Sequence, residues 1–166
     1  SAADGIAGLL TVEGGKWTTS RRLAEKAVDR LREKAGLSIT PSVSSRQYLK
    51  GCEIPDLNAF LAHIKGKNTD FHGKTIDCLG RLYGTDHEKV LDLAREDNIL
   101  DQRLNSDGEL LAQVVYGVRY EMARTLKDIV LRRTGIATLG NPGENILLRV
   151  AGVVARELNW GKKKIF

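Results

Sequence analysis

The amino-acid sequence predicts a mainly α-helical fold, in which a strand-turn-helix unit precedes a compact helical domain. Three observations support this fold class. Residues 6–12 form a short apolar run that leads into a pair of glycines. Residues 37–55 lose hydrophobic periodicity and contain two prolines, which indicates a linker or a domain boundary. After this stretch, apolar residues recur at helical spacing, and no two alternating segments that could pair as a sheet are present.

The first unit is expected to consist of a buried strand, a tight turn and a helix. Residues 6–12, IAGLLTV, are apolar and partly β-branched, and Gly14-Gly15 supplies the turn. The hydroxyls of Thr18–Ser20 can cap a helix, which Gly36 then ends. The apolar face of this helix is formed by Leu23, Ala24, Ala27, Val28 and Leu31.

The helical domain is expected to begin with three short helices. Asp56 caps the first, the second begins near Asp70, and Thr85–Glu88 opens the third. Thr85–Glu88 has the form of a capping box, in which a hydroxyl and a carboxylate bind each other's free backbone N–H groups. The apolar faces contain Leu57, Phe60, Leu61 and Ile64 in the first helix, and Ile76, Leu79 and Leu82 in the second.

The second half of the domain is expected to hold longer helices. Ser106–Glu109 also has the form of a capping box and predicts a long helix with Leu111, Val115, Val118 and Met122 on one face. Thr125–Asp128 opens another helix that leads to Arg132-Arg133. Asn141–Glu144 combines a cap, a proline at the first helical position and an acidic first turn. The last helix then carries Leu147, Val150, Ala151, Val154 and Leu158.

The composition is that of a soluble globular protein. The chain has 166 residues, of which 26 are basic and 21 acidic, so its net charge is +5. No apolar run approaches the ~20 residues of a membrane span, and the start lacks the pattern of a signal peptide. Cys52 and Cys78 belong to no CxxC pair, which favours free thiols in a reducing compartment, although a disulfide stays open. The basic run Lys162–Lys164 permits contact with nucleic acid or anionic lipid, but a solvated surface is the favoured interpretation.

The segment Gly14–Thr19 carries the clearest chemical pattern. A glycine pair lets the backbone approach a ligand, the following helix N-terminus offers unpaired N–H groups, and Lys16 adds a positive charge. An anion or an electron-rich ring edge suits such a place, and a plain tight turn is the alternative. The segment is not a P-loop, because Leu10 and Trp17 occupy required motif positions, and the GxGxxG fingerprint of dinucleotide binding is absent from the sequence.

Two segments resemble FAD-dependent glycerol-3-phosphate dehydrogenases, of the aerobic and anaerobic type. The stretch LLTVEGGKWTTSRRLAEKAVD, residues 9–29, is similar to the segment that closes their flavin-binding domain, where a Gly-Gly-Lys-(Leu or Trp)-Thr-Thr run precedes a helix. Residues 114–128, followed by Leu-Arg-Arg-Thr at 131–134, are similar to their helical C-terminal domain. The resemblance implies that residues 1–39 are the last piece of the FAD-binding domain and that residues 40–166 form the all-α C-terminal domain.

The same resemblance implies a set of site residues. Gly15, Lys16, Trp17 and Thr18 should bind FAD at the pyrimidine end of its ring, where positive charge stabilises the reduced form. Lys16 and Thr18 should lie near the flavin or the phosphate of the substrate. The catalytic base would lie upstream of this chain. Ser20 departs from the family pattern, because many relatives have Tyr at this position.

The resemblance also implies the reaction and the partners of the parent enzyme. The family oxidises sn-glycerol 3-phosphate to dihydroxyacetone phosphate and passes electrons to a membrane quinone, or to oxygen in its oxidase branch. The parent is expected to be cytoplasmic, with peripheral contact at the inner face of the cytoplasmic membrane. The isolated chain is expected to be inactive, to retain no FAD and to need the rest of the FAD domain as its partner.

Other residues are weaker candidates. His63, His72 and His87 have no metal-ligand spacing, which favours surface or capping roles. Glu121 is expected to pair with an arginine and tie helices together rather than act in catalysis. Arg132-Arg133 is expected to form ion pairs with the rest of the enzyme, with a grip on a phosphate or carboxylate as the alternative.

A stand-alone basic helical module that binds protein or nucleic acid is the competing function class. Nucleic-acid binding is disfavoured, because the helix that begins at Thr125 carries only Lys127 and Asp128 near its N-terminus, where a helix-turn-helix reader needs Arg, Asn or Gln. An apolar strand without a partner strand also argues against a self-contained module, because its backbone groups need neighbours.

Overall fold

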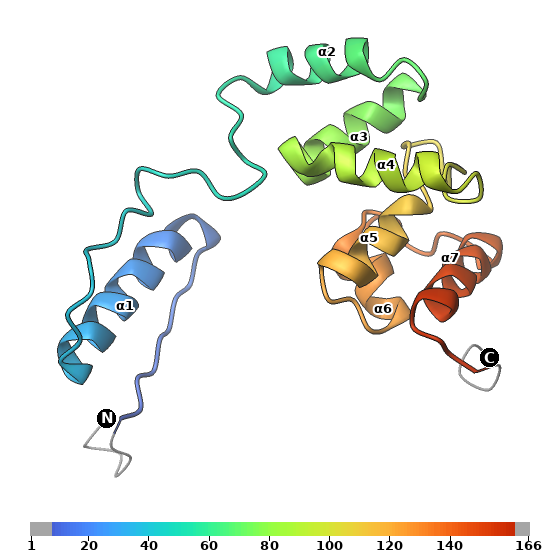
Figure 1. The fold of residues 1–166 in the computed structure, drawn as a ribbon. Helices are drawn as coiled ribbons and strands as arrows, with labels where there is room; N and C mark the ends of the chain where they lie inside the picture. Colours follow the sequence, from blue (N-terminus) through green and yellow to red (C-terminus); the bar gives the residue numbers. More distant parts are fainter. Residues whose placement is uncertain (1–7, 162–166) are drawn as a thin grey trace. The chain divides into compact units, whose positions relative to one another are not determined.

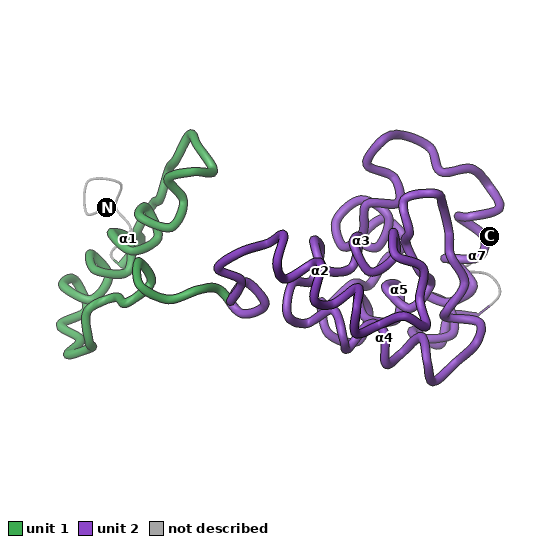
Figure 2. The backbone as a smooth tube through the Cα atoms, turned by 90° about the horizontal axis from the view of Figure 1, so that it is seen from above, with its two compact units in different colours: residues 1–49 green, residues 50–166 purple. Residues whose placement is uncertain are grey.

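The computed structural model describes residues 8–161 of the chain (Figure 1). The chain divides into two compact units, residues 1–49 and residues 50–166 (Figure 2). The described part is helical and contains no β-strand, with one isolated antiparallel bridge between Arg103 and Leu110. The mainly α fold class is therefore confirmed.

The described part of unit 1 consists of one helix and irregular segments. A 3₁₀ turn, η2 (Trp17–Thr19), leads into α1 (Ser20–Ala35). Gly36 ends α1 in the left-handed region at φ 63°, and its N–H donates to the carbonyls of Arg32 and Glu33. A glycine is favoured there because it has no Cβ to clash with the backbone. The predicted helix and its glycine stop are confirmed.

The strand predicted over residues 6–12 is not formed in the described residues 8–12; residues 6 and 7 lie outside the description. Leu9 and Val12 are about half exposed, and among residues 8–161 the only hydrogen bond to this segment is from Lys34 Nζ to the Leu9 carbonyl. A strand is stable only when its backbone groups pair with a neighbouring strand. The described part of this chain provides no such neighbour.

Unit 1 builds no hydrophobic core within residues 8–49. None of these residues is buried, and α1 leaves Val28 and Leu31 about half exposed on its apolar face. Amphipathic helices in globular proteins are held mainly by burial of the apolar stripe. The apolar face of α1 therefore lacks a cover within its own unit.

Unit 2 is a bundle of short helices. Its elements are α2 (Leu57–Lys67), α3 (Gly73–Tyr83), η3 (Gly84–Asp86), α4 (His87–Glu96), α5 (Ala112–Tyr120), α6 (Leu126–Asp128), the π-helical η4 (Ile129–Arg133) and α7 (Glu144–Glu157). Helix α2 packs on α3, and α5 packs on α4, α7 and η4 (Figure 1). Every residue from 112 to 118 is buried, so α5 is the central element of this unit.

Two of the predicted N-caps, at Asp56 and Thr125, are confirmed, and the other four are wrong. Asp56 caps α2 by accepting the Ala59 N–H, and Thr125 and Asp128 form a complete capping box at α6. Hydrogen bonds from the Arg124 backbone N–H and from Thr125 hold the pKa of Asp128 at about 2. Thr85–Glu88 forms no box, because 3₁₀ backbone occupies this position and the Glu88 carboxylate binds other side chains.

The segment Ser106–Glu109 does not open a helix either. Its backbone returns along the preceding loop, where the Leu104 N–H donates to the Glu109 carbonyl next to the Arg103–Leu110 bridge. Helix α5 begins only at Ala112. The Glu109 side chain accepts a hydrogen bond from Asn105 at 2.6 Å instead of capping a helix.

The last helix also begins later than predicted. Helix α7 starts at Glu144 with Gly143 as its N-cap, so Pro142 precedes the helix and does not occupy its first position. The Asn141 side chain accepts the Gly143 N–H in a local turn. The predicted apolar face is largely confirmed, since Val150, Ala151 and Val154 are buried.

The end of α5 differs most from the sequence prediction. The helix ends at Tyr120, and the Ala123 N–H donates to the Gly117 carbonyl, which closes the helix with Met122 in the left-handed region at φ 59°. Met122 is 77% exposed, although its spacing predicted a place on the buried face. Because α5 ends at Tyr120, Met122 is not part of the helix and does not continue its buried face.

No helix within residues 8–161 has the length and the apolar character needed to cross a membrane.

We expect Met122→Gly to stabilise this chain. A left-handed backbone costs a residue with a side chain roughly 1–2 kcal/mol, and glycine loses roughly 0.5–1 kcal/mol more conformational entropy on folding, so the net gain should be about 0.5–1 kcal/mol. Urea unfolding followed by circular dichroism measures this change. Met122→Ala is the matched control, because alanine keeps the backbone strain; equal stability of the Gly and Ala variants would contradict the prediction.

Candidate functional site

The predicted ligand-binding turn lies at the N-terminus of α1. Lys16 is extended, and its carbonyl accepts the Thr19 N–H at 3.2 Å and the Thr19 hydroxyl at 3.0 Å. The Ser20 hydroxyl donates to the Trp17 carbonyl at 2.7 Å. These hydroxyls therefore donate to carbonyls and do not accept from the free N–H groups, which corrects the prediction that they cap the helix.

The helix start at Lys16 has no negative group of its own. Neither η2 nor α1 has a side-chain cap, and no acidic residue lies in the first turn of either. Uncapped N–H groups at a helix start carry a partial positive charge and bind anions. The arrangement therefore suits a negative or electron-rich group supplied from outside this segment.

The four predicted site residues lie together at one exposed turn. Gly15, Lys16, Trp17 and Thr18 are all exposed, and Trp17 is 94% exposed. A Cβ added at Gly15 would meet no atom within 4 Å, whereas one at Gly14 would overlap the Leu23 side chain. Gly14 thus lies against the Leu23 side chain of α1, and Gly15 leaves open space that a ligand or another protein segment can approach.

The histidines occupy three different environments. His63 is exposed, and His72 caps α3 by accepting the Lys74 N–H at 3.2 Å. His87 was predicted to be a surface or capping residue, but it is buried against Phe60, with Nδ1 2.8 Å from the Gly84 carbonyl. Within residues 8–161, no group of three or more His, Cys, Asp or Glu side chains could hold a metal ion.

Glu121 does not form the predicted ion pair with an arginine. Arg132 instead pairs with Asp128 one turn before it, and Arg133 Nε donates to the Glu121 backbone carbonyl at 2.9 Å. The Glu121 atom Oε2 is buried without a hydrogen-bond partner among the described residues. Burial raises the pKa of this carboxyl, and the nearby charge of Arg133 partly opposes that rise.

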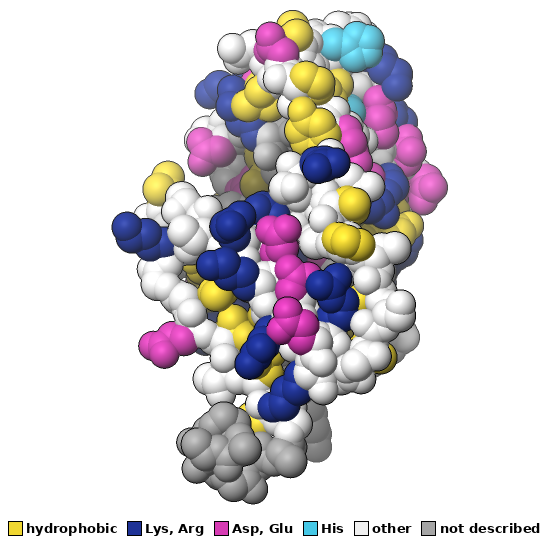
Figure 3. All heavy atoms as spheres, turned by 90° about the vertical axis from the view of Figure 1, so that its left-hand side faces the viewer, with side chains coloured by type: hydrophobic (Ala, Val, Ile, Leu, Met, Phe, Trp, Pro, Cys, Tyr) yellow, Lys and Arg dark blue, Asp and Glu magenta, His cyan; other side chains and the backbone are white. Residues whose placement is uncertain are grey.

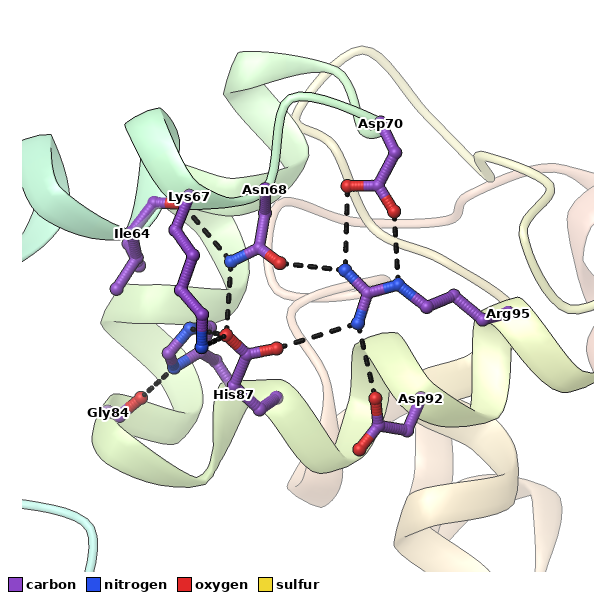
Figure 4. Close-up of polar contacts among 9 residues, drawn as sticks. Ile64, Lys67, Asn68, Asp70, Gly84, His87, Asp92 and Arg95 are labelled. Carbon is purple, nitrogen blue, oxygen red and sulfur yellow. Dashed lines mark hydrogen bonds and ion pairs between the residues drawn. The ribbon is translucent and has the colours of Figure 1, made fainter.

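A polar network centred on the buried Asn68 joins the end of α2 to α4 (Figure 4). Asn68, which is 2% exposed, donates to the Ile64 carbonyl at 3.1 Å and to Glu88 Oε1 at 3.2 Å, and its own oxygen accepts from Arg95 Nη2 at 2.7 Å. Arg95 also pairs with Asp70 at 3.0 Å, and Lys67 donates to Glu88 at 2.9 Å.

The charged groups of this network bind one another and hold α2 against α4. Burial raises the pKa of Glu88, but hydrogen bonds from Lys67 and Asn68 outweigh burial and leave it below its usual value. The guanidinium of Arg95 also lies over the Phe71 ring at 5.2 Å. The sequence does not predict this polar network, because its residues come from the end of α2, the following loop and α4, and no local spacing connects them.

A cleft of about 780 Å³ lies between α3, the loop before α5 and the loop after η4. Lys65 and Arg81 on its wall are both paired with Asp77, at 2.7 and 2.8 Å, which lowers the pKa of this carboxyl. Burial raises the pKa of the Cys78 thiol to about 12, so this cysteine is a poor nucleophile. Lys65, Asp77 and Arg81 are therefore engaged in ion pairs and the Cys78 thiol stays protonated, so these four groups are not arranged as an acid and a base.

Positive and negative side chains are mixed on the surface. Figure 3 shows, on the face that it draws, Lys and Arg side chains interspersed with Asp and Glu side chains. Opposite charges also pair along one helix, as in the α1 pairs Arg21–Glu25 and Arg30–Glu33. On that face the net positive charge is not gathered into a single-sign patch of the kind that nucleic acids select.

Comparison with known proteins gives a consistent match. The family model described as the C-terminal domain of alpha-glycerophosphate oxidase matches residues 10–165. Glycerol-3-phosphate dehydrogenase of Synechocystis is 34% identical over 97% of this chain, and the mitochondrial enzyme of Rattus norvegicus is 31% identical over 93%. The matched regions are only 29% and 22% of these two relatives. No solved structure matches the chain.

We expect Asn68→Ala to destabilise unit 2 by about 1–3 kcal/mol, because it removes the buried amide that bonds both Glu88 and the Arg95 guanidinium. Urea unfolding measures the loss. Asn145→Ala, at an exposed position of α7, is the matched control and should change stability by no more than about 0.5 kcal/mol. Equal effects of the two substitutions would show that the network contributes little.

Proposed function

This chain belongs to the family of the C-terminal domain of alpha-glycerophosphate oxidase, and from that premise we propose that it is the C-terminal part of a flavoenzyme that oxidises sn-glycerol 3-phosphate. The observation that carries the proposal is the family match over residues 10–165, which spans both units. The product would be dihydroxyacetone phosphate, and the electrons would pass to a quinone. The chain spans less than a third of the length of the curated relatives that it matches.

The incomplete packing of unit 1 supports its place in a larger enzyme. None of its described residues is buried, and the apolar residues 9–12 have no strand partner there. We infer that the part of the parent outside this chain, its FAD-binding domain, covers the apolar face of α1 and pairs with residues 9–12 as a strand. Such pairing would satisfy the backbone N–H and C=O groups of this segment.

The residues at the start of α1 fit FAD. The N–H groups of the uncapped helix start and the ammonium of Lys16 would attract an electron-rich edge of the isoalloxazine ring or the phosphate of the substrate. Open space at Gly15 would allow close approach, and Trp17 and Thr18 would lie beside it. When bound, FAD supplies the acceptor for the hydride that leaves the substrate. The role of Lys16 is to stabilise negative charge, and the base would come from the upstream part.

The helical unit has a supporting rather than a catalytic role in this proposal. Lys65, Asp77 and Arg81 in the cleft beside α3 are engaged in ion pairs, and the polar network around Asn68 holds helices together. The parent would act in the cytoplasm, with peripheral contact at the inner face of the membrane, where it meets the quinone. The isolated chain would have no activity and retain no FAD.

We expect the full-length parent to be purified with a yellow flavin spectrum that bleaches when sn-glycerol 3-phosphate is added without oxygen. The absorbance at about 400–500 nm, where oxidised flavin absorbs, decreases as two electrons pass from the substrate to FAD. A colourless parent that takes up no FAD would refute the proposal and leave a stand-alone helical binding module.

We expect Lys16→Gln in the parent to slow bleaching at low substrate by about 10- to 100-fold, because a charged hydrogen bond contributes roughly 1.5–3 kcal/mol. Stopped-flow absorbance measures the rate. Lys26→Gln is the matched control, since it removes the same charge from an exposed position on α1. A rate equal to that of the control would exclude Lys16 from the site.

A further inference from the structure

The turn that follows α5 displays two large apolar side chains to solvent. Tyr120 is 61% exposed and Met122 is 77% exposed, and they flank the half-buried Glu121. The Tyr120 ring is held 5.0 Å from the ring of Tyr116, which is buried in the core. Tyr, Met and Arg are enriched at the centres of protein interfaces, where an apolar anchor fills a recess of the partner. We call Tyr120, Glu121, Met122 and Arg133 the α5-turn surface.

The backbone at this turn is held in an unfavourable conformation. Met122 has φ 59°, in the left-handed region where glycine is the residue usually found after a helix. The Ala123 N–H donates to the Gly117 carbonyl at 2.9 Å, so the turn is fixed by the end of the helix. The exposed Met122 side chain buries little apolar surface within unit 2, so it does not offset the free-energy cost of its own backbone strain.

The carboxyl of Glu121 lacks a donor. Its Oε2 atom is buried and makes no hydrogen bond with the described residues. The nearest cation, Arg133, binds the backbone carbonyl of Glu121 at 2.9 Å through Nε. A buried carboxylate oxygen is normally hydrogen-bonded, and leaving it unpaired is costly. Arg133 itself forms no ion pair with an Asp or Glu within the described part of the chain.

These features have one explanation in common. We propose that the α5-turn surface is the place where the helical unit docks on the portion of the parent polypeptide outside this chain. That portion would offer an apolar recess to Tyr120 and Met122, an N–H or cationic donor to Glu121, and an acceptor to Arg133. Each of the exposed or unpaired groups would then gain a partner.

The length of the relatives favours this occupant over a second copy of the chain. More than two thirds of each matched relative lies outside the matched region, since the chain corresponds to 29% and 22% of two of them. The inference rests on the proposed function in one respect, which is that the chain is part of a longer parent. It adds a second contact region, in unit 2, to the cover inferred for α1 in unit 1.

Cysteine labelling tests the proposal. Met122→Cys is made in this chain and in the full-length parent, and the rate of maleimide modification at residue 122 is measured by peptide mass spectrometry, which separates it from Cys52 and Cys78. We expect at least about tenfold slower labelling in the parent than in this chain, a factor that corresponds to 1.4 kcal/mol of protection. Asn145→Cys, on the exposed side of α7, is the control and should label at the same rate in both.

The outcomes separate docking from the flavin chemistry. Equal rates at residue 122 in the parent and in this chain overturn the proposal, even if the parent bleaches with sn-glycerol 3-phosphate. The proposal is also overturned if labelling at residue 122 in this chain, without the rest of the parent, slows as the protein concentration rises, because a second copy is then the occupant. Protection in a colourless parent supports docking while it removes the proposed function. If the cysteine variant does not fold, slower hydrogen exchange of amides 118–124 in the unmodified parent than in this chain gives the same test.

Discussion

The burial of α5 on every side is the constraint on which the helical unit depends. All seven residues from 112 to 118 are buried, and α4, α7 and η4 each pack against them. Gly117 allows η4 to lie close to α5, because a Cβ there would come within 2.8 Å of the Ile129 side chain. Full burial of one Val contributes about 1.5–3 kcal/mol, so Val114, Val115 and Val118 each add to the stability of the unit.

A helix buried on all sides must also satisfy its polar groups. Gln113 is fully buried, and its oxygen accepts the Leu110 N–H at 2.8 Å while its nitrogen donates to the Tyr83 hydroxyl at 3.2 Å. This pairing fixes the start of α5 and ties it to α3. The exposed end of the same helix is different, because Glu121 has a buried oxygen without a donor and Met122 stands in solvent. The core side of α5 is complete within this chain, and its outer end is not.

The two units differ in the same way. Unit 2 has a continuous core, whereas the described part of unit 1 has none. The turn of unit 1 that is proposed to bind a ligand, Gly15–Thr18, is exposed and is not enclosed by the described part of that unit. Clefts that hold a cofactor normally surround most of its surface. In the proposed function, unit 1 would contribute a helix start and a lysine to the site, and another part of the parent would supply the enclosure.

The sequence by itself determined the helical class, because spacing at three and four residues reports one buried face. It also identified the Asp56 and Thr125 caps, where the cap side chain and the backbone N–H that it accepts are neighbours along the chain. The roles predicted for Gly15, Lys16, Trp17 and Thr18 stay predictions that rest on family resemblance.

Only the tertiary structure decided which partner a side chain takes when several are possible. The carboxylate of Glu88 binds Lys67 and Asn68 from α2 rather than capping its own helix, and Glu109 lies in a reversed loop beside Asn105. Met122 fits the apolar spacing, but α5 ends two residues before it. Local pattern describes what a segment can do alone, whereas the partner that a side chain takes depends on contacts between helices far apart in the sequence.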